Sequence, residues 1–231
     1  MGLPAPVITE HDGLLVVRDD MLPGGTKRRT LGQFLPQFAT DHFIYASMAQ
    51  VYGPVALAYA CQDLGYKASL IYSWRKHVNK APLMQEAAEA GADIVMTDRQ
   101  AFFTVVQKKA RDFAADHPRA VLLKMGFDYP AFVEATAEVA RNIDLQPEEV
   151  WCAAGSGALT RALQMAWPHA EHHAVRVSGV AGDFGDAVLH RASEGFTESA
   201  KDRPPFPSAK SYDAKIWQFA KKQARPGALV W

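Results

Sequence analysis

The sequence has few cysteines, no surplus of either charge and no long apolar run. Cys61 and Cys152 are the only cysteines among 231 residues, and both lie in apolar segments. We therefore expect buried thiols in a reducing compartment and no disulfide framework. Because 25 basic residues balance 25 acidic ones, the chain as a whole is not drawn to nucleic acid or to an anionic membrane, and only a local basic patch would provide such attraction.

No run of about 18 apolar residues is present, which argues against a membrane-spanning helix. Residues 1–10 also lack the basic segment and the apolar stretch of an export signal, so we expect a cytoplasmic protein. The length suits one large domain or two small ones.

Strand-like and helix-like segments alternate between residues 43 and 178, and this alternation predicts an α/β fold with mostly parallel sheets flanked by helices. Gly53 and Pro54 open one expected helix, which Gly65 closes. Asp98 is expected to cap another helix, which runs to about residue 115. The remaining expected helices cover 82–90, 130–141, a segment ending near 167, and 212–222; the expected strands cover 68–74, 93–97, 120–124, 150–154 and 174–177.

Lys27 is a candidate reactive side chain, because it closely follows the glycine pair Gly24 and Gly25, where backbone can approach a ligand. To form an imine with an aldehyde, a lysine must spend time deprotonated, so its pKa must fall from about 10.4. A helix expected to begin at Arg28, and the charges of Arg28 and Arg29, would both lower this pKa. Taken alone, the string favours a solvated basic turn.

A second candidate site is the loop Gly155-Ser156-Gly157-Ala158, which follows an apolar strand and precedes a helical pattern. Its backbone N–H groups, with the hydroxyls of Ser156 and Thr160, would suit a phosphate at a helix N-terminus. The loop is not a dinucleotide fingerprint, because Thr160 replaces the third glycine, and it lacks the patterns of a nucleophile elbow and a P-loop. A tight packing turn is an equal alternative. Pyridoxal phosphate, a phosphorylated aldehyde, would join this loop and Lys27 into one site.

Histidines 169, 172 and 173 follow Pro168, but they lack cysteines and a metal-binding spacing. We expect a polar turn there and predict no metal site.

A basic stretch close to aromatic residues follows the strand expected at 68–74. This pattern suits a phosphate-bearing polymer, and it is also typical of a solvated loop. Its members are Tyr72, Trp74, Arg75, Lys76, His77 and Lys80.

Five segments occur in an order that is more specific than any one of them. They are the run 24–29, similar to Gly-Gly-Asn-Lys-x-Arg with a Schiff-base lysine; 55–60 with 64–68; 84–97; the loop 155–157; and 209–211 with 227–231. In this order they resemble the fold-type II pyridoxal-phosphate enzymes, the tryptophan synthase β-like superfamily. The resemblance is greatest to the branch of aminocyclopropane-carboxylate deaminase and D-cysteine desulfhydrase.

The resemblance implies a two-lobed fold, with residues 1–40 and 142–231 as the larger, cofactor-binding lobe and 41–141 as a smaller α/β lobe. It also implies pyridoxal 5'-phosphate as the cofactor and a homodimer. Lys27 would be the Schiff-base lysine and the proton shuttle at Cα of the substrate. Ser208 falls where this branch places the group facing the pyridine nitrogen, although a simple turn residue is an equal alternative. The phosphate would be held by Gly155, Ser156, Gly157 and Ala158.

The chain departs from the family where the family's Ser-Gly-Asn loop binds the substrate carboxylate. That loop aligns near 47–52, which makes Ser47, Gln50 and Tyr52 the candidate substrate-binding residues. Tyr52 replaces the usual asparagine, and its phenol is a candidate acid or base. Leu159 takes the place of the last threonine of the phosphate loop, with Thr160 one position later.

Three functions follow as expectations. The first is a pyridoxal-phosphate lyase that forms a carbanion at Cα of a small amino acid, with elimination, deamination or decarboxylation left open. The second is a virus-encoded enzyme, in the host cytoplasm, that acts on an amino acid attached to a modified DNA base, as in thymidine hypermodification by decarboxylation. The third is a scaffold that keeps the fold and has lost catalysis.

Overall fold

The computed structural model describes residues 3–76, 81–179 and 181–231. The chain divides into two compact units, a terminal unit of segments 1–22 and 130–231 and a central unit of residues 23–129. The expected boundaries lay at residues 40 and 141 instead. The difference arises because α1 (Gly25–Phe34) packs on α2 (Gly53–Leu64), whereas α5 (Pro130–Arg141) packs on α6 (Ala158–Ala166).

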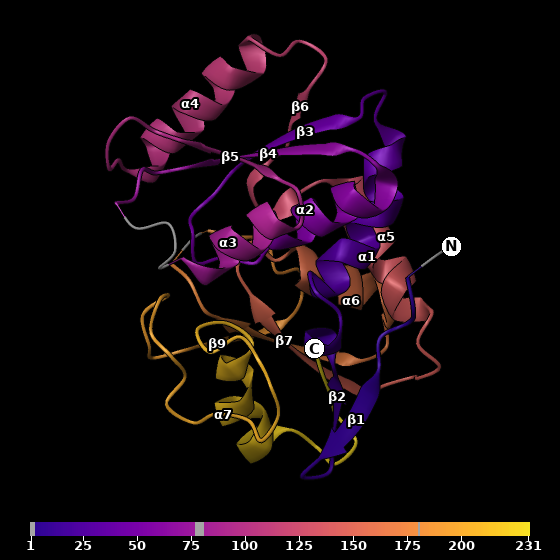
Figure 1. Ribbon diagram of the computed structural model, residues 1–231. Helices are drawn as coiled ribbons and strands as arrows, with labels where there is room; N and C mark the ends of the chain where they lie inside the picture. Colours follow the sequence, from indigo (N-terminus) through magenta and orange to yellow (C-terminus); the bar gives the residue numbers. More distant parts are fainter. Residues whose placement is uncertain (1–2, 77–80, 180) are drawn as a thin grey trace. The chain divides into compact units, whose positions relative to one another are not determined.

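The terminal unit is built on a six-stranded sheet in the order β1-β2-β10-β7-β8-β9 (Figure 1). Only β1 and β2 pair in antiparallel fashion, and the other neighbours are parallel. The strands are β1 (Ile8–His11), β2 (Leu14–Val17), β7 (Glu149–Ala154), β8 (Glu171–Arg176), β9 (Val188–Arg191) and β10 (Leu229–Val230).

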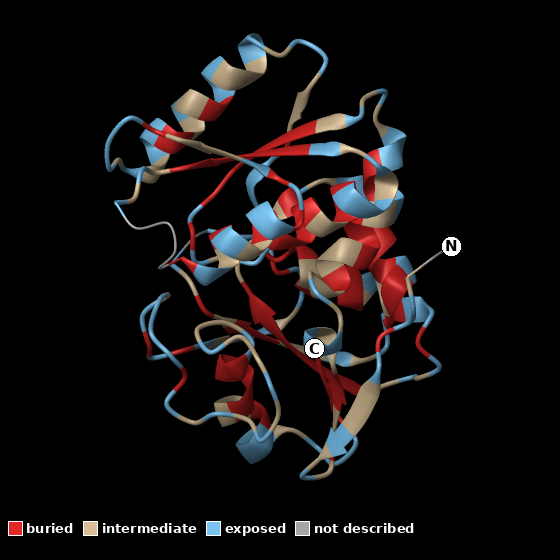
Figure 2. Cartoon of the chain, in the orientation of Figure 1, coloured by how far each residue is buried: buried red, intermediate tan, exposed pale blue. Residues whose placement is uncertain are grey.

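Strand β7 carries the core of this unit, because its side chains alternate between two apolar layers. Val150 and Cys152 pack with residues of α5 and α6, including Leu163. Trp151 and Ala153 pack with residues of α7 (Ala214–Gln223) on the other face. All six residues of β7 are buried, as the red strand in Figure 2 shows. A strand buried on both faces explains the continuous apolar run at this point of the sequence.

The central unit has a four-stranded, fully parallel sheet in the order β5-β4-β3-β6. Helix α4 (Phe103–Ala115) lies on one face of this sheet, and α2 and α3 (Pro82–Glu89) lie on the other (Figure 1). The strands are β3 (His42–Ala46), β4 (Lys67–Tyr72), β5 (Asp93–Met96) and β6 (Val121–Leu122). The two mostly parallel sheets with flanking helices confirm the predicted α/β class.

The structure corrects the expected start of α4. Asp98 caps no helix, because α4 begins five residues later with Phe102 as its N-cap residue. Residues 97–101 instead form a loop held by Thr97, whose Oγ1 donates to the Arg99 carbonyl oxygen at 2.7 Å. The short strands β1, β2, β9 and β10 were also not expected from the sequence.

Both cysteines are free and buried, as expected. Burial raises the pKa of Cys61 to about 12 and that of Cys152 to about 11, so both remain protonated thiols at neutral pH. None of the helices in the described part of the chain has the length and apolar character needed to cross a bilayer.

Candidate functional site

Lys27 lies in the first turn of α1, in the central unit, and its side chain is partly exposed. The helix begins at Gly25, three residues before the expected start at Arg28. Gly24 is the N-cap residue with a φ of 85°, and a Cβ there would lie 3.1 Å from Cα of Ala56. Glycine is therefore needed both for the left-handed backbone and for the close approach of α1 to the first turn of α2.

Arg28 and Arg29 were expected to act on Lys27 by like-charge repulsion. The structure gives Arg28 a carboxylate partner, because its Nε and Nη2 both donate to Asp63 at 2.7 Å. The guanidinium also lies over the ring of Tyr59, 4.8 Å from its centroid. These contacts fix α1 on α2 and offset much of the repulsion that Arg28 would exert.

The loop Gly155–Ala158 joins the carboxyl end of β7 to the first turn of α6, in the terminal unit. Gly157 is the N-cap residue with a φ of 88°, and the hydroxyl of Ser156 lies 3.5 Å from the Ala158 nitrogen. The first N–H groups of a helix lack intrahelical partners, and the helix dipole favours an anion beside them. The predicted phosphate loop thus has the local geometry that anion binding requires.

Two segments that the sequence did not connect with this loop pack against it. A Cβ on Gly157 would lie 1.8 Å from the carbonyl oxygen of Asp183, and a Cβ on Gly182 would lie 2.7 Å from that of Ser156. A Cβ on Gly155 would lie 2.8 Å from the hydroxyl of Tyr212. Close packing against backbone therefore requires glycine at 157 and 182, whereas at 155 the nearest atom is the end of a side chain, the phenol of Tyr212, which lies at the start of the loop. No local motif marks Tyr212 in the sequence.

The predicted role of Thr160 does not fit its position. Its side chain is 1% exposed, and its Oγ1 lies 3.3 Å from Sγ of Cys152 inside the core. The hydroxyl therefore faces the interior and serves the packing of α6 on β7. Ser208 lies partly exposed in the segment before α7.

The three candidate substrate residues lie where β3 ends, at the carboxyl edge of the central sheet. Ser47 is buried, and its nitrogen donates to the Ile71 carbonyl oxygen at 2.9 Å, which continues the pairing of β3 with β4. Gln50 is exposed. Tyr52 is 47% exposed and precedes α2, whose first turn it closes through a 3.0 Å bond from the Ala56 nitrogen to its carbonyl oxygen. Because Ala56 lies against Gly24, the structure brings the starts of α1 and α2, and so the segments of Lys27 and Tyr52, together.

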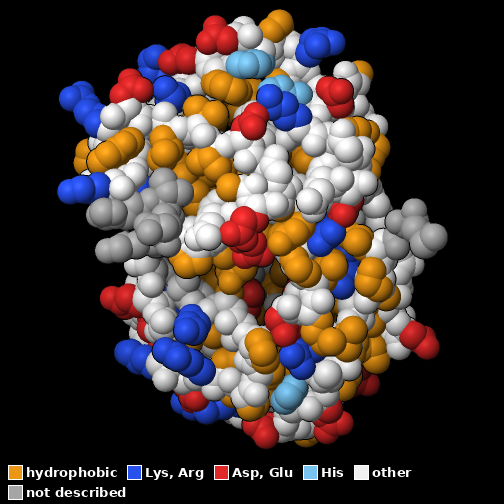
Figure 3. Space-filling view, in the orientation of Figure 1, with side chains coloured by type: hydrophobic (Ala, Val, Ile, Leu, Met, Phe, Trp, Pro, Cys, Tyr) orange, Lys and Arg blue, Asp and Glu red, His pale blue; other side chains and the backbone are white. Residues whose placement is uncertain are grey.

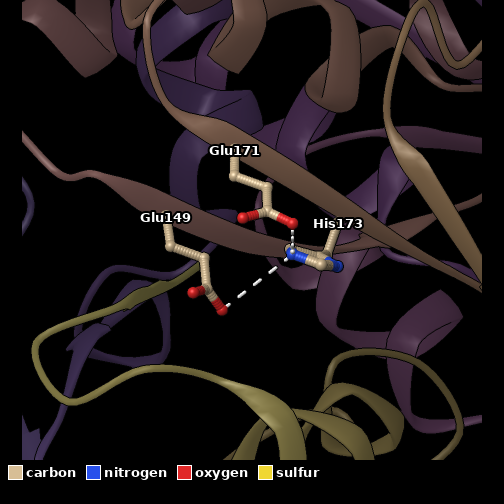
Figure 4. Close-up of side chains that lie close together, drawn as sticks. All are labelled: Glu149, Glu171 and His173. Atoms are coloured by element: carbon tan, nitrogen blue, oxygen red, sulfur yellow. Dashed lines mark ion pairs between the residues drawn. The ribbon is translucent and has the colours of Figure 1, made fainter.

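The expected polar turn after Pro168 holds only for His169, which is exposed in a turn. His172 and His173 instead lie in β8, and His173 joins Glu149 and Glu171 at the amino ends of β7 and β8 (Figure 4). His173 Nε2 lies 3.3 Å from a Glu171 oxygen and 3.9 Å from a Glu149 oxygen, and its ring stacks on Trp151 with centroids 4.1 Å apart. The sequence did not reveal this group of possible metal ligands, because the three residues meet only through the pairing of β7 with β8.

The described contacts of Glu149 make this group an ion cluster. Trp151 Nε1 donates to Glu149 Oε1 at 2.5 Å, and Arg225 Nε lies 3.2 Å from Oε2. Arg225 also pairs with Glu171. A cation would have to displace this guanidinium from both carboxylates. The cluster lies at the amino end of β7, and the loop Gly155–Ala158 begins at the other end.

Glu149→Ala is expected to destabilise the protein by about 2–3 kcal/mol, because the buried Trp151 N–H loses its acceptor. Glu149 is 3% exposed, whereas Glu171 is 43% exposed in the same cluster. Glu171→Ala is therefore the matched control, with an expected loss below about 1 kcal/mol. Urea unfolding measures both, and equal losses would contradict the importance of the buried carboxylate.

His172 is expected to make stability depend on pH. Burial lowers its pKa, and its Nε2 lies 2.9 Å from the Trp167 carbonyl oxygen. Because the pKa in the folded state lies below the unfolded value of about 6.5, the unfolded chain binds more protons between the two. This contribution is complete above about pH 6.5 and is lost as the pH falls through the folded pKa.

Unfolding midpoints at pH 7.5 and 5.5 test this expectation. The drop should be smaller in His172→Gln than in the wild type, and unchanged in His169→Gln, since His169 is exposed. Equal drops in all three proteins would show that His172 does not contribute.

Comparisons with known proteins bear on the fold. No protein-family model and no curated protein matches the chain. A solved ACC deaminase homologue matches with a TM-score of 0.70 and 15% identity over 94% of this chain and 82% of that chain. Diaminopropionate ammonia lyase of Escherichia coli gives 0.60 and 14% over 94% and 76%, and threonine deaminase isoform 2 of Solanum lycopersicum gives 0.57 and 15% over 94% and 60%.

Identities of 14–15% show the fold alone. The chain shares its fold with these three structures, as the order of the motifs predicted.

Proposed function

We propose that this chain is a pyridoxal-phosphate enzyme that forms a carbanion at Cα of an amino-acid substrate. The observation that carries the proposal is the presence of two features in one chain. A partly exposed lysine lies in the first turn of α1, and a glycine-serine-glycine loop lies at the start of α6. A fold shared with a diaminopropionate ammonia lyase and a threonine deaminase over 94% of the chain supports it.

The residues present fit the cofactor. The loop offers helix N-terminal N–H groups, the Ser156 hydroxyl and a backbone that admits no Cβ at Gly157, which together suit a phosphate dianion. Lys27 Nζ would supply the amine that holds the aldehyde. When bound, pyridoxal phosphate supplies an electron sink for the carbanion at Cα.

The remaining roles, which are proton transfer and the binding of phosphate and substrate, fall to side chains and backbone of this chain. We assign to Lys27 Nζ the transfer of the proton at Cα, and to Gly155, Ser156, Gly157 and Ala158 the binding of the phosphate. The Ser208 hydroxyl would lie toward the pyridine nitrogen and would leave it largely unprotonated, because a neutral hydroxyl does not stabilise a protonated ring as a carboxylate does. Ser47 and Gln50 bind the substrate, and the Tyr52 phenol donates or accepts a proton near it.

The substrate class follows from these assignments. A small free amino acid fits the first version of the proposal, with elimination, deamination or decarboxylation as the outcome that the orientation of the Cα bonds selects. We further propose a cytoplasmic homodimer.

A second version has the amino acid attached to a modified DNA base, with decarboxylation as the reaction. The exposed phenol of Tyr52 favours this version, because it replaces the asparagine that would bind a free substrate in the family. The exposed side chains of Trp74 and Phe102, on loops at the same edge of the central sheet, support it further.

Absorbance spectroscopy tests the proposal. The purified protein, titrated with pyridoxal phosphate, is expected to develop a visible band at one cofactor per chain, and this band should shift when a productive amino acid is added. A shift only with an aminoacylated oligonucleotide would favour the second version. A protein that stays colourless in excess cofactor would be a scaffold and would overturn the proposal.

A further inference from the structure

Two aromatic side chains stand exposed on neighbouring loops of the central unit. Phe102 is 87% exposed just before α4, and Trp74 is 39% exposed just after β4. The next residue, Phe103, packs against the core beneath α4. Phe102 therefore contributes nothing comparable to the core, and large exposed aromatics on one face are typical of binding surfaces.

The two loops are held together by their own hydrogen bonds. The nitrogen of Trp74 donates to Thr97 Oγ1 at 2.9 Å, and the nitrogen of Ala101 donates to Ser73 Oγ at 2.9 Å. The pairing of β4 with β5 continues into them, since the nitrogen of Thr97 donates to the Tyr72 carbonyl oxygen. Both aromatics thus stand on backbone that is already fixed, which lowers the entropy lost on binding.

The charge around these aromatics is positive. Residues 73–76 and 97–102 contain three basic side chains, of Arg75, Lys76 and Arg99, and one acidic side chain, of Asp98. Asp98 lies 3.6 Å from Nζ of Lys109, so its charge is partly offset. Figure 3 shows hydrophobic and basic side chains interspersed over the central unit near the start of α4. The whole chain has no net charge, so this excess of positive charge is specific to the two loops. His77 and Lys80, which the sequence placed in the same basic stretch, lie outside the described residues.

The same edge of the sheet carries the candidate substrate loop. β4 lies between β3 and β5, so the loops after these three strands follow one another along the carboxyl edge. Ligands of open parallel sheets bind at this edge. A substrate whose amino-acid end lies at Ser47, Gln50 and Tyr52 would extend over Trp74 and Phe102.

We infer that the surface formed by Trp74, Phe102, Arg75, Lys76 and Arg99, here called the aromatic-basic edge, binds a single-stranded segment of nucleic acid next to the substrate loop. Bases stack on the two aromatic rings, and phosphates bind the three basic side chains. A purely apolar partner would not use the charges, and a simple polyanion would not use the rings. The link from this surface to an amino-acid substrate rests on the proposed function, but the binding itself does not.

Fluorescence anisotropy with a labelled 12-nucleotide oligodeoxythymidine tests the inference on the full chain. Trp74→Ala and Phe102→Ala should each weaken binding about 5- to 150-fold, as expected for the loss of one stacked base. The triple variant Arg75→Ser/Lys76→Ser/Arg99→Ser should lower the slope of log affinity against log salt by about 2, since each contact with single strands contributes about 0.7. Val188→Ala/Leu189→Ala, which truncates similarly exposed side chains of β9, is the matched control and should bind as the wild type does.

Three outcomes would overturn the inference. The first is that the wild type does not bind the oligonucleotide, and the second is that the aromatic variants bind it as well as the wild type does. The third is that, in a parallel assay with anionic vesicles, the variants lose binding to the vesicles but none to the oligonucleotide. The visible absorbance with pyridoxal phosphate, measured on the same variants, separates this result from the proposed function. Oligonucleotide binding without that absorbance would support the binding surface and contradict the proposed enzyme. Absorbance without oligonucleotide binding would support the enzyme and contradict the binding surface.

Discussion

Lys27→Ala is expected to abolish both the visible absorbance that pyridoxal phosphate gives with this chain and the turnover of any substrate. The absorbance depends on attachment of the aldehyde to an amine, and alanine removes that amine. The fold should persist, because Lys27 is partly exposed in the first turn of α1 and lies outside the apolar core. Circular dichroism and unfolding midpoints close to those of the wild type would exclude a trivial loss of structure.

Lys108→Ala is the matched control for this loss. Lys108 lies on an exposed face of α4 and pairs with the exposed Asp112 four residues later. Its removal should leave the absorbance unchanged and cost no more than a few tenths of a kcal/mol. A visible band that persists in Lys27→Ala would show that another amine holds the cofactor.

If the band persisted in Lys27→Ala, Lys215 would be the next amine to test. Its side chain is fully buried in α7, and burial lowers its pKa, which the nearby Glu194 and Glu198 partly restore. Its Nζ donates to the Gly195 carbonyl oxygen at 2.8 Å. A lowered pKa is typical of reactive lysines, but an enclosed, hydrogen-bonded amine is poorly placed to meet an aldehyde. Lys215→Met should therefore keep the band, if the variant folds.

The sequence predicted the elements whose signals are local. α2 has a proline in its first turn and Gly65 at its end, where φ is 69°, and its bounds are as expected. The apolar run before Gly155 became β7, and the loop that follows it does open α6. In these cases the residues that determine an element are adjacent in the chain.

The features that were missed depend on distant partners. β10 has only two residues and exists because Leu229 and Val230 pair with both β2 and β7. The polar residues His172 and His173 form a strand through pairing with Val150 and Trp151. The exposure of Phe102 could not be told from that of Phe103, because the two adjacent phenylalanines have no helical or strand period that separates them.

The candidate site shows the same division. Lys27 and Gly155–Ala158 were found from glycines in the local string, whereas Thr160 was assigned to the phosphate although its hydroxyl faces Cys152. The spacing of Thr160 from the loop did not reveal which side of α6 it occupies. Tyr212 and Asp183 approach the loop only through tertiary packing.

Gly157→Ala is expected to cost about 2–6 kcal/mol of folding free energy, together with most of the affinity for cofactor phosphate. Two penalties combine there. The φ of 88° strains any residue with a Cβ, at about 1–3 kcal/mol, and the Cβ would lie 1.8 Å from the Asp183 carbonyl oxygen, where the backbone must move. Since total stabilities are about 5–15 kcal/mol, a large share would be lost.

Gly227→Ala separates the two penalties, because Gly227 has a φ of 82° in the same unit and no atom within 4 Å of an added Cβ. Its cost should be the backbone strain alone, about 1–2 kcal/mol, with the cofactor affinity unchanged. Urea unfolding and titration with pyridoxal phosphate measure both quantities for the two variants. If the segment 182–184 fixes the loop in the shape that binds phosphate, Gly157→Ala must lower the affinity for pyridoxal phosphate as well as the stability, whereas Gly227→Ala lowers the stability alone. Equal affinities in the two variants would mean that the loop is a packing turn and that the phosphate is held elsewhere.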